Sequence, residues 1–278
     1  MPHVSILRRG FVACILATMR LFALALLTAT TTALAQTPSL PTPEQANLQF
    51  EVASIRPSNP DAPLGSIKPA AGGDGYTVQG EPVRLMISLM FRIPERQIKG
   101  PDWIEKDRFD IVAKANKKYT VDELHAMYQN LLIDRFKLKY HLETKEANAY
   151  VLTVDKGGLK MVPDDKPEDF SIPWIPQGYG SVKGTRVPIP YLCWQLGQIL
   201  QDDERPVVDA TGLKDKYDFT LIWLPGNADQ FRDKLPPDVF DRPVIFSAVR
   251  DQLGLKLTAQ KGPVTYFVVD HIERPTEN

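Results

Sequence analysis

The alternation of apolar and polar residues in "DRFDIVAKA", residues 107–115, predicts a strand with one buried face. Phe109, Ile111 and Ala113 share that face, since side chains two residues apart on a strand point the same way. The string "DKYDFTLIW", residues 215–223, opens with the same Asp–basic–aromatic–Asp order and then alternates in the same way. The two strings predict equivalent strands in two related parts of the chain.

Four other stretches carry apolar residues three and four positions apart, which is typical of amphipathic helices. The clearest helix is predicted to begin at Thr120, because Thr120 and Glu123 form a T-x-x-E capping box. The last helix is predicted to end at Gly254, since glycine readily adopts the left-handed conformation that ends helices. The apolar stripes of the four helices are Leu85, Met86, Leu89 and Met90; Leu124, Met127, Tyr128, Leu131 and Leu132; Leu192, Cys193, Leu196, Ile199 and Leu200; and Phe246, Val249 and Leu253.

Strands and helices follow the same order twice, so the sequence predicts an α+β fold made by tandem duplication of a β-α-β-α-β-β unit. We expect mostly antiparallel or mixed sheets, with a first unit over residues 50–158 and a second over residues 179–278. Each unit is expected to end in two strands, joined at turns near Lys145 and Lys261. The Pro- and acid-rich residues 159–178 are predicted to be a linker.

The first 35 residues have the pattern of a secretory signal: basic residues, an apolar run, and small residues before a cleavage site expected after Ala35. Met19 followed by Arg20 would also begin a compact signal by itself. Residues 36–49 are predicted to be a flexible lead-in, because they are rich in proline and polar residues. We therefore expect a periplasmic or secreted protein, which would meet the membrane only through a leader that is not cleaved.

Charge argues against nucleic acid as a partner. The full chain has a net charge of −1, and removing the three arginines of residues 1–35 from the 33 basic residues leaves 30 against 34 acidic residues. A nucleic-acid-binding protein would need a clustered positive face, which this balance does not favour. Cys193 is the single cysteine after the leader, so no internal disulfide is expected, and its apolar neighbours predict a buried packing role.

Four aspartates of the two strand strings are candidates for acid–base work or for a divalent ion. Residues three apart on a strand lie on opposite faces, so each pair is predicted to bond local backbone groups instead. The four residues are Asp107, Asp110, Asp215 and Asp218.

Two H-x-E pairs place a histidine and a carboxylate on one strand face: His141 with Glu143, and His271 with Glu273. Zinc normally takes three or four protein ligands, and each pair offers two. No nucleophile–base spacing accompanies them. The sequence therefore predicts no metal, no cofactor and no catalytic residue, and it leaves open whether the protein is an enzyme while favouring that it is not.

Tryptophans supply the other candidates for contact with a partner. Trp174 is flanked by isoleucine and proline in the predicted linker, where it would either dock between the two units or contact a partner. Trp103 lies in the loop before the first strand string. With Trp174 and Trp103, His141 and His271 complete the candidate contact residues.

Nearly all of residues 50–278 resembles a family of secreted bacterial proteins typical of soil acidobacteria, which is known only as a domain of unknown function. The strings that carry the resemblance are "FEVASIRPS", "GPDWIEKDRFDIVAKA", "LLIDRFKLKYHLETKE", "VVDATGLKDKYDFTLIW", "QLGLKL" and "VVDHIERPTEN". The resemblance implies export, and it implies that some relatives are joined to membrane peptidase-like sensors. It supplies no catalytic residues.

Each unit also resembles the short N-terminal domain of secretins and TonB-dependent receptors, through the strand before "EPVRLMISLMF" and through "YTVDELHAMYQNLLIDRFKLKY". That resemblance implies a periplasmic protein-contact module. The chain departs from the pattern in the loop "ERQIKGPDWIEK" and in a long insertion that the second unit alone carries, Leu224–Pro243.

These features favour a non-enzymatic binding or interaction protein of the cell envelope, whose partner is an unknown envelope protein or peptide, because exposed sheet edges accept an additional strand. One alternative is the sensory domain of an envelope signalling system that binds a small molecule or a cell-wall fragment. The other is a hydrolase with a dispersed active site, which would need a pocket that holds His141 or His271 beside a carboxylate.

Overall fold

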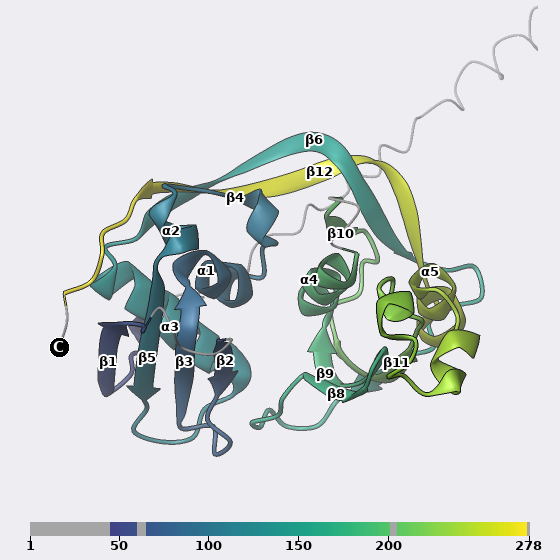
Figure 1. Cartoon of the computed structure of the whole chain (residues 1–278), viewed down its shortest axis with the longest axis horizontal. Helices are drawn as coiled ribbons and strands as arrows, with labels where there is room; N and C mark the ends of the chain where they lie inside the picture. The colour runs from purple at the N-terminus through teal and green to yellow at the C-terminus, as the bar shows by residue number, and fades with distance from the viewer. Residues whose placement is uncertain (1–44, 60–64, 201–204, 277–278) are drawn as a thin grey trace, which may run out of the picture. The chain divides into compact units, whose positions relative to one another are not determined.

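The computed structural model describes residues 45–59, 65–200 and 205–276, all within the unit formed by residues 34–278. These residues form an α+β fold with three four-stranded sheets, as the sequence predicts (Figure 1). The predicted signal peptide, residues 1–35, lies outside the described residues. Within the described ranges no helix has both the length and the apolar character needed to span a bilayer.

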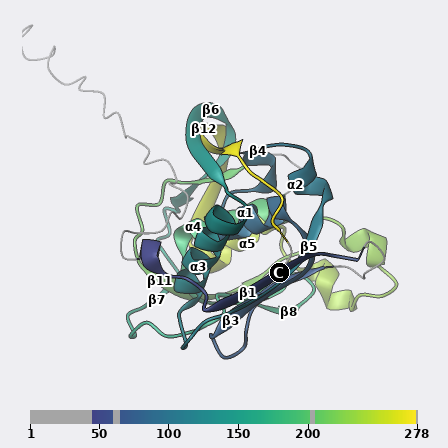
Figure 2. The same cartoon turned by 90° about the vertical axis from the view of Figure 1, so that its left-hand side faces the viewer.

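The first sheet contains the strand predicted in residues 107–115 and has the strand order β1-β5-β3-β2. Phe109, Ile111 and Ala113 of β5 are at most 4% exposed, so the predicted alternation is confirmed. Helices α1 and α3 cover the inner face (Figures 1 and 2). The bounds are β1 Val52–Pro57, β2 Ser66–Pro69, β3 Gly75–Pro82, β5 Arg108–Lys114, α1 Val83–Phe91 and α3 Val121–Arg135.

The second sheet, with the strand order β7-β11-β9-β8, belongs to the C-terminal half and lies beneath helix α4 (Figure 1). Two of its strands, β7 and β8, come from residues 159–178, which the sequence predicts to be a linker. The bounds are β7 Val162–Asp164, β8 Trp174–Gly178, β9 Ser181–Pro188, β11 Lys216–Ile222 and α4 Ile189–Ile199.

The third sheet is built on two long strands, β6 and β12, which pair antiparallel along their lengths and pass over the helices of both halves (Figures 1 and 2). The short strand β4 of the N-terminal half pairs parallel with β12, and β10 of the C-terminal half pairs parallel with β6. Each half is therefore completed by the final strand of the other half. The bounds are β4 Ile98–Lys99, β6 Lys139–Val154, β10 Val207–Asp209 and β12 Leu255–His271.

The turns expected near Lys145 and Lys261 are wrong, because each predicted strand pair is one continuous strand. Lys145 pairs with Val264, and Lys261 pairs with Asn148, in the middle of the ribbon. The stretch around Lys145 is exposed to solvent and therefore polar, and this polar composition is also typical of a turn. Its backbone groups are satisfied by the opposite strand, so no buried side chains are needed there. From β3 to β6 and from β9 to β12, each half therefore has the element order β-α-β-β-α-β, with the short β4 or β10 after the first helix.

The remaining elements are short helical turns that connect these parts. The bounds are η1 Gln45–Asn47, η2 Glu95–Gln97, α2 Trp103–Lys106, η4 Ala228–Phe231, η5 Pro237–Asp241, α5 Ile245–Ala248 and the π-helical η6 Val249–Leu253. The predicted stop at Gly254 is confirmed, since Gly254 ends η6 with φ +69°.

One large hydrophobic core contains side chains from both halves. Helices α1 and α4 meet within it, where the Trp194 indole Nε1–H donates to Ser88 Oγ at 3.1 Å. Cys193 is 1% exposed, which confirms its predicted packing role. On the other side of α1, Phe91 packs against Tyr140 of β6 and Phe267 of β12. The helices thus form a middle layer between the long ribbon and the other two sheets.

Replacing Gly254 with alanine is expected to lower the free energy of unfolding by about 3 kcal/mol or more. A Cβ atom at this position would lie 2.0 Å from the carbonyl oxygen of Gly158, in addition to the cost of a left-handed backbone. Gly212→Ala is the matched control, because Gly212 has φ +72° with open space around it and should lose only about 1 kcal/mol. Urea denaturation of both variants measures the difference, and equal losses would contradict the packing argument.

Candidate functional site

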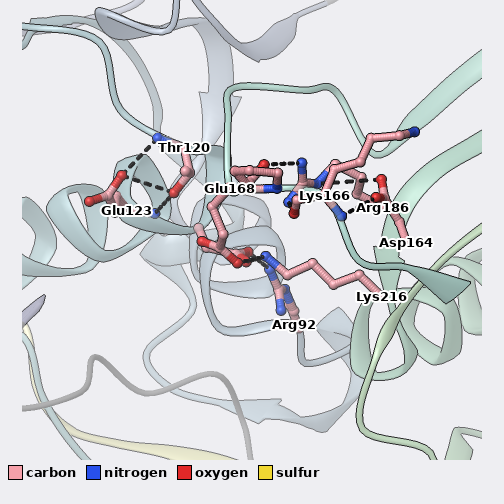
Figure 3. A network of polar contacts seen from close by, with 10 residues as sticks. Arg92, Thr120, Glu123, Asp164, Lys166, Glu168, Arg186 and Lys216 are labelled. Carbon is pink, nitrogen blue, oxygen red and sulfur yellow. Dashed lines mark hydrogen bonds and ion pairs between the residues drawn. The ribbon is translucent and has the colours of Figure 1, made fainter.

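A charged network joins helices α1 and α3 to strand β11, and it lies where the two halves meet (Figure 3). The Asp122 carboxylate accepts hydrogen bonds from the guanidinium of Arg92 and, at 3.0 Å, from the ammonium of Lys216. Lys216 also donates to Glu168 at 2.7 Å. The Arg92 side chain is 8% exposed and the Asp122 side chain 31% exposed, so this is a largely enclosed set of charges.

Local structure positions each member of the network. Arg92 ends α1 in a left-handed conformation, with φ 54°, directly after the last helical turn. Asp122 lies in the first turn of α3, whose predicted capping box is present: Thr120 Oγ1 accepts from the Glu123 N–H, and Glu123 Oε2 accepts from the Thr120 N–H at 2.8 Å. The cap fixes the helix start, and a carboxylate there is favoured by the helix dipole.

Burial by itself would raise the pKa of the Asp122 carboxyl, but the charges of Arg92 and Lys216 outweigh it and hold that pKa well below its usual range. Burial likewise opposes the charge of Lys216, yet Asp122 and Glu168 raise the pKa of its ammonium. Both groups are therefore fixed in their charged forms at neutral pH. Such groups are suited to holding two segments together and poorly suited to transferring a proton.

His125 lies beneath this network and is 3% exposed. Its Nε2 is 3.2 Å from the Tyr76 hydroxyl. Burial, reinforced by the positive charge of Arg92 and opposed by Asp122, lowers the pKa of His125 to about 3. The imidazole is therefore neutral in the folded protein over most of the accessible pH range.

Near Asp122, Arg186 of β9 holds the segment between β7 and β8, which also carries Glu168 of the network (Figure 3). Its guanidinium donates to the carbonyl oxygens of Pro167 and Lys166 at 2.6 and 3.1 Å and lies 3.8 Å from the Asp164 carboxylate. The space between these groups has a volume of about 20 Å³, which is enough for about one water molecule. The network is therefore a junction between segments and does not enclose room for a substrate.

In each of the two strand strings, the second aspartate bonds a backbone group, as predicted. Asp110 accepts from the Gly80 N–H at 2.9 Å, and Asp218 accepts from the Arg186 N–H at 2.7 Å. Gly80 and Arg186 both have positive φ, at points where the pairing of β3 with β5 and of β9 with β11 shifts register. Each aspartate therefore stabilises an irregular point in the neighbouring strand.

The H-x-E histidines lie on the exposed surface at one end of the ribbon. His141 Nδ1 is 2.8 Å from Asp270 Oδ1, and its Nε2 is 3.6 Å from Glu143. The hydrogen bond to Asp270 is the main cause of a raised His141 pKa. His271 Nε2 is 2.7 Å from Glu273. Within the described ranges, no cluster of three or more potential metal ligands is present, and neither histidine lines a described pocket.

The two candidate tryptophans are partly buried and lie in different places. Trp174 opens β8 and packs edge-on against Phe219 of β11, with ring centroids 6.1 Å apart. Trp103 begins α2, and the Arg274 guanidinium lies 4.9 Å above its ring. The structure does not bring the two tryptophans together with His141 and His271 into one site.

A groove between β1 and α3 was not predicted from the sequence. It has a volume of about 210 Å³. Its location follows from two long-range facts, that β1 ends its sheet and that α3 runs beside it, which local patterns do not contain. The lining residues are Gln49, Phe50, Glu51, Ala53, Met127, Leu131, Asp134 and Arg135.

Asp122→Asn is expected to lower the free energy of unfolding by about 2 kcal/mol, because it leaves Arg92 and Lys216 without their shared counter-charge. Breaking a fully buried pair costs about 3–5 kcal/mol, and the partial exposure of Asp122 reduces that figure. Asp102→Asn is the control, since its pair with Lys106 is exposed and should change stability by less than about 0.5 kcal/mol. Equal stabilities of the two variants in urea would contradict a joining role for Asp122.

The free energy of unfolding is expected to fall as the pH drops from about 6.5 toward 3, because the unfolded chain protonates His125 whereas the folded chain does not. Over that window this single group contributes a slope of about 1.4 kcal/mol per pH unit. His125→Gln should flatten the slope by that amount between about pH 6 and pH 4. Urea titrations at several pH values measure the slope, and identical slopes for the two proteins would refute the assignment.

A comparison with protein families identifies the family of this chain. The family described as "Protein of unknown function (DUF3738)" matches residues 84–272, which include the charged network and both long ribbon strands. Neither the curated proteins nor the solved structures give a match. Because the match covers more than half of the chain, the protein belongs to the DUF3738 family of proteins of unknown function.

Proposed function

We propose that this protein is an exported, non-enzymatic binding protein of the cell envelope, which holds an extended segment of a partner protein against strand β1. The observation that carries the proposal is the groove of about 210 Å³ between β1 and α3. An end strand beside a helix is a recurring arrangement for peptide capture, because the edge supplies backbone hydrogen bonds and the helix supplies side-chain contacts.

β1 ends its sheet, so alternate backbone groups along it point away from β5. Ser58 N–H donates to Arg108 O, so the even-numbered residues of β1 exchange hydrogen bonds with β5, and the odd-numbered residues point away from it. Ala53 O faces outward in this way and accepts from Arg135 at 3.5 Å, which is long for a hydrogen bond.

The lining of the groove indicates the kind of segment that would fit. Phe50, Met127 and Leu131 form its apolar part, and Glu51 and Asp134 place carboxylates at its rim. Side chains of an added strand alternate between the two faces of the sheet. A suitable segment would therefore carry an apolar residue toward α3 and a basic residue near Glu51 or Asp134.

Several further observations support binding over catalysis. The enclosed charges of Asp122 and Lys216 are held in their ionised forms, and the His141–Asp270 pair is exposed to solvent. The leader-like residues 1–35 support export to the periplasm or beyond. The resemblance to secreted acidobacterial proteins and to the short N-terminal domain of secretins supports a role in protein contact.

We also infer that the two halves are copies of one ancestral unit. Both halves have the order β-α-β-β-α-β, and the pairings of β4 with β12 and of β10 with β6 are reciprocal. Asp110 and Asp218 bond equivalent positions in the two halves, which supports the same conclusion.

Ala53→Pro is expected to weaken the capture of extended peptides. Proline at this position removes an outward N–H and leaves the pairing of β1 with β5 intact. The probe is a phage-displayed library of linear peptides, panned on the wild-type protein, with enriched sequences synthesised and measured by fluorescence anisotropy. Affinity for these peptides should fall by about tenfold or more in the variant.

The matched control is Ile67→Pro, on the strand β2 at the opposite end of the same sheet. The pair Ala70–Gly75 is hydrogen-bonded, so the Ile67 N–H also points away from its partner strand. This variant should bind the enriched peptides with unchanged affinity. Failure to enrich any peptide, or equal binding by the wild-type protein and the folded Ala53→Pro variant, would overturn the proposal.

A further inference from the structure

The insertion that only the second half carries forms an ordered loop, and a hollow opens beside it. The loop is closed at its base, where Leu224 N–H donates to the Pro243 carbonyl at 2.9 Å. Arg242 donates to the Tyr179 carbonyl, and the Tyr179 ring packs against Phe231. Long ordered loops that interrupt a regular fold are commonly functional, because the fold itself does not need them.

The hollow has a volume of about 390 Å³, which is within the range of about 300–1,000 Å³ typical of small-molecule sites. It lies between the end of α4, the end of β11 and the turn that begins η4. The lining residues are Gln198, Ile199, Trp223, Pro225, Gly226, Asn227 and Gln230. No charged side chain is among these described lining residues, although 24% of the residues in the chain are charged.

The polar groups of this lining are three carboxamides, and their hydrogen-bonding groups remain available. The Tyr179 hydroxyl donates to Asn227 Oδ1 at 2.5 Å, which fixes the Asn227 side chain and leaves its NH₂ group to donate elsewhere. Among the described residues, no hydrogen bond is made by the side chains of Gln198 or Gln230, so each offers both a donor and an acceptor.

The aromatic member is Trp223, which is held firmly. Its backbone N–H donates to the Gly180 carbonyl at 2.8 Å. Gly180 has φ +64°, and a Cβ atom there would lie 2.2 Å from the Trp223 carbonyl oxygen, so this close approach requires glycine. The electron-rich face of an indole attracts polarised C–H groups, and it stacks against apolar ring faces.

From these observations we infer that the hollow binds a neutral saccharide of one or two rings. A sugar ring has an apolar C–H face, suited to Trp223, and hydroxyl groups around its edge that both donate and accept, suited to carboxamides. The described lining residues carry no positive charge that would pair with a phosphate or a carboxylate. The inference is independent of peptide capture at β1, and it supplies the sensory alternative with a definite ligand class.

The test measures saturation-transfer NMR and calorimetric binding of three probes to the purified protein: N,N′-diacetylchitobiose, cellobiose and maltose. The first carries the acetylated amino sugar of cell-wall glycans, and the other two are plain glucose disaccharides. Binding of the first alone indicates a cell-wall source, and binding of a glucose disaccharide indicates a glucan source. Either result supports the inference, whereas no binding of any probe at millimolar concentration overturns it.

Variants place the binding at this hollow. The double variant Gln198→Ala/Gln230→Ala should weaken the affinity for the bound disaccharide by about tenfold or more, because it removes two carboxamides. Gln177→Ala, which removes an exposed carboxamide from β8, is the control and should bind normally. Trp223→Phe keeps an aromatic ring for packing but removes the indole face that would contact the sugar. Saturation transfer to the bound disaccharide should therefore decrease. Unchanged affinity in the folded double variant would assign the sugar to another surface and overturn the inference.

Discussion

The antiparallel pairing of β6 with β12 is the constraint on which the rest of the structure depends. The ladder runs from Lys139 paired with His271 to Leu255 paired with Val154, so one ribbon reaches over both halves. Phe91 packs beneath it on one side, and Tyr150 packs against Phe246 on the other. Because β4 and β10 attach to opposite strands of the ribbon, neither half can complete its sheet without the other.

The charged network reinforces the ribbon at the opposite side of the helices. Burying charges is unfavourable unless they are paired and hydrogen-bonded, and Asp122 meets this condition by contacting both Arg92 and Lys216. Arg92 comes from the first half and Lys216 from the second, so the shared carboxylate favours one arrangement of the two halves over others. The exposed surfaces, at β1 and at the loop after β11, are thereby held on a rigid frame.

Local features were predictable from the sequence because their causes are local. The capping box at Thr120, the alternation in β5 and the stop at Gly254 each depend on a few neighbouring residues. The backbone-bonding role of Asp110 followed in the same way, from the geometry of a strand. The long strands were missed, since the exposed run around Lys145 has the composition of a turn and is extended only because β12 lies opposite.

The candidate sites were less predictable, because each is made by segments far apart in the chain. Nothing near Asp122 in the sequence identifies Arg92 and Lys216 as its partners, and the groove beside β1 requires knowing that this strand ends a sheet. His141 and Asp270 likewise meet only across the ribbon. The sequence did signal the insertion after β11, which interrupts the predicted repeat and forms the loop beside the hollow.

The ribbon also determines the order in which the chain can fold. β12 is the last strand in the part of the chain that the structure describes, and it pairs with both β6 and β4. Neither half is complete until these pairings have formed. Contacts of such large sequence separation slow folding, because the intervening chain must first be brought together. A growing chain therefore cannot reach its final state until residues 255–271 are available.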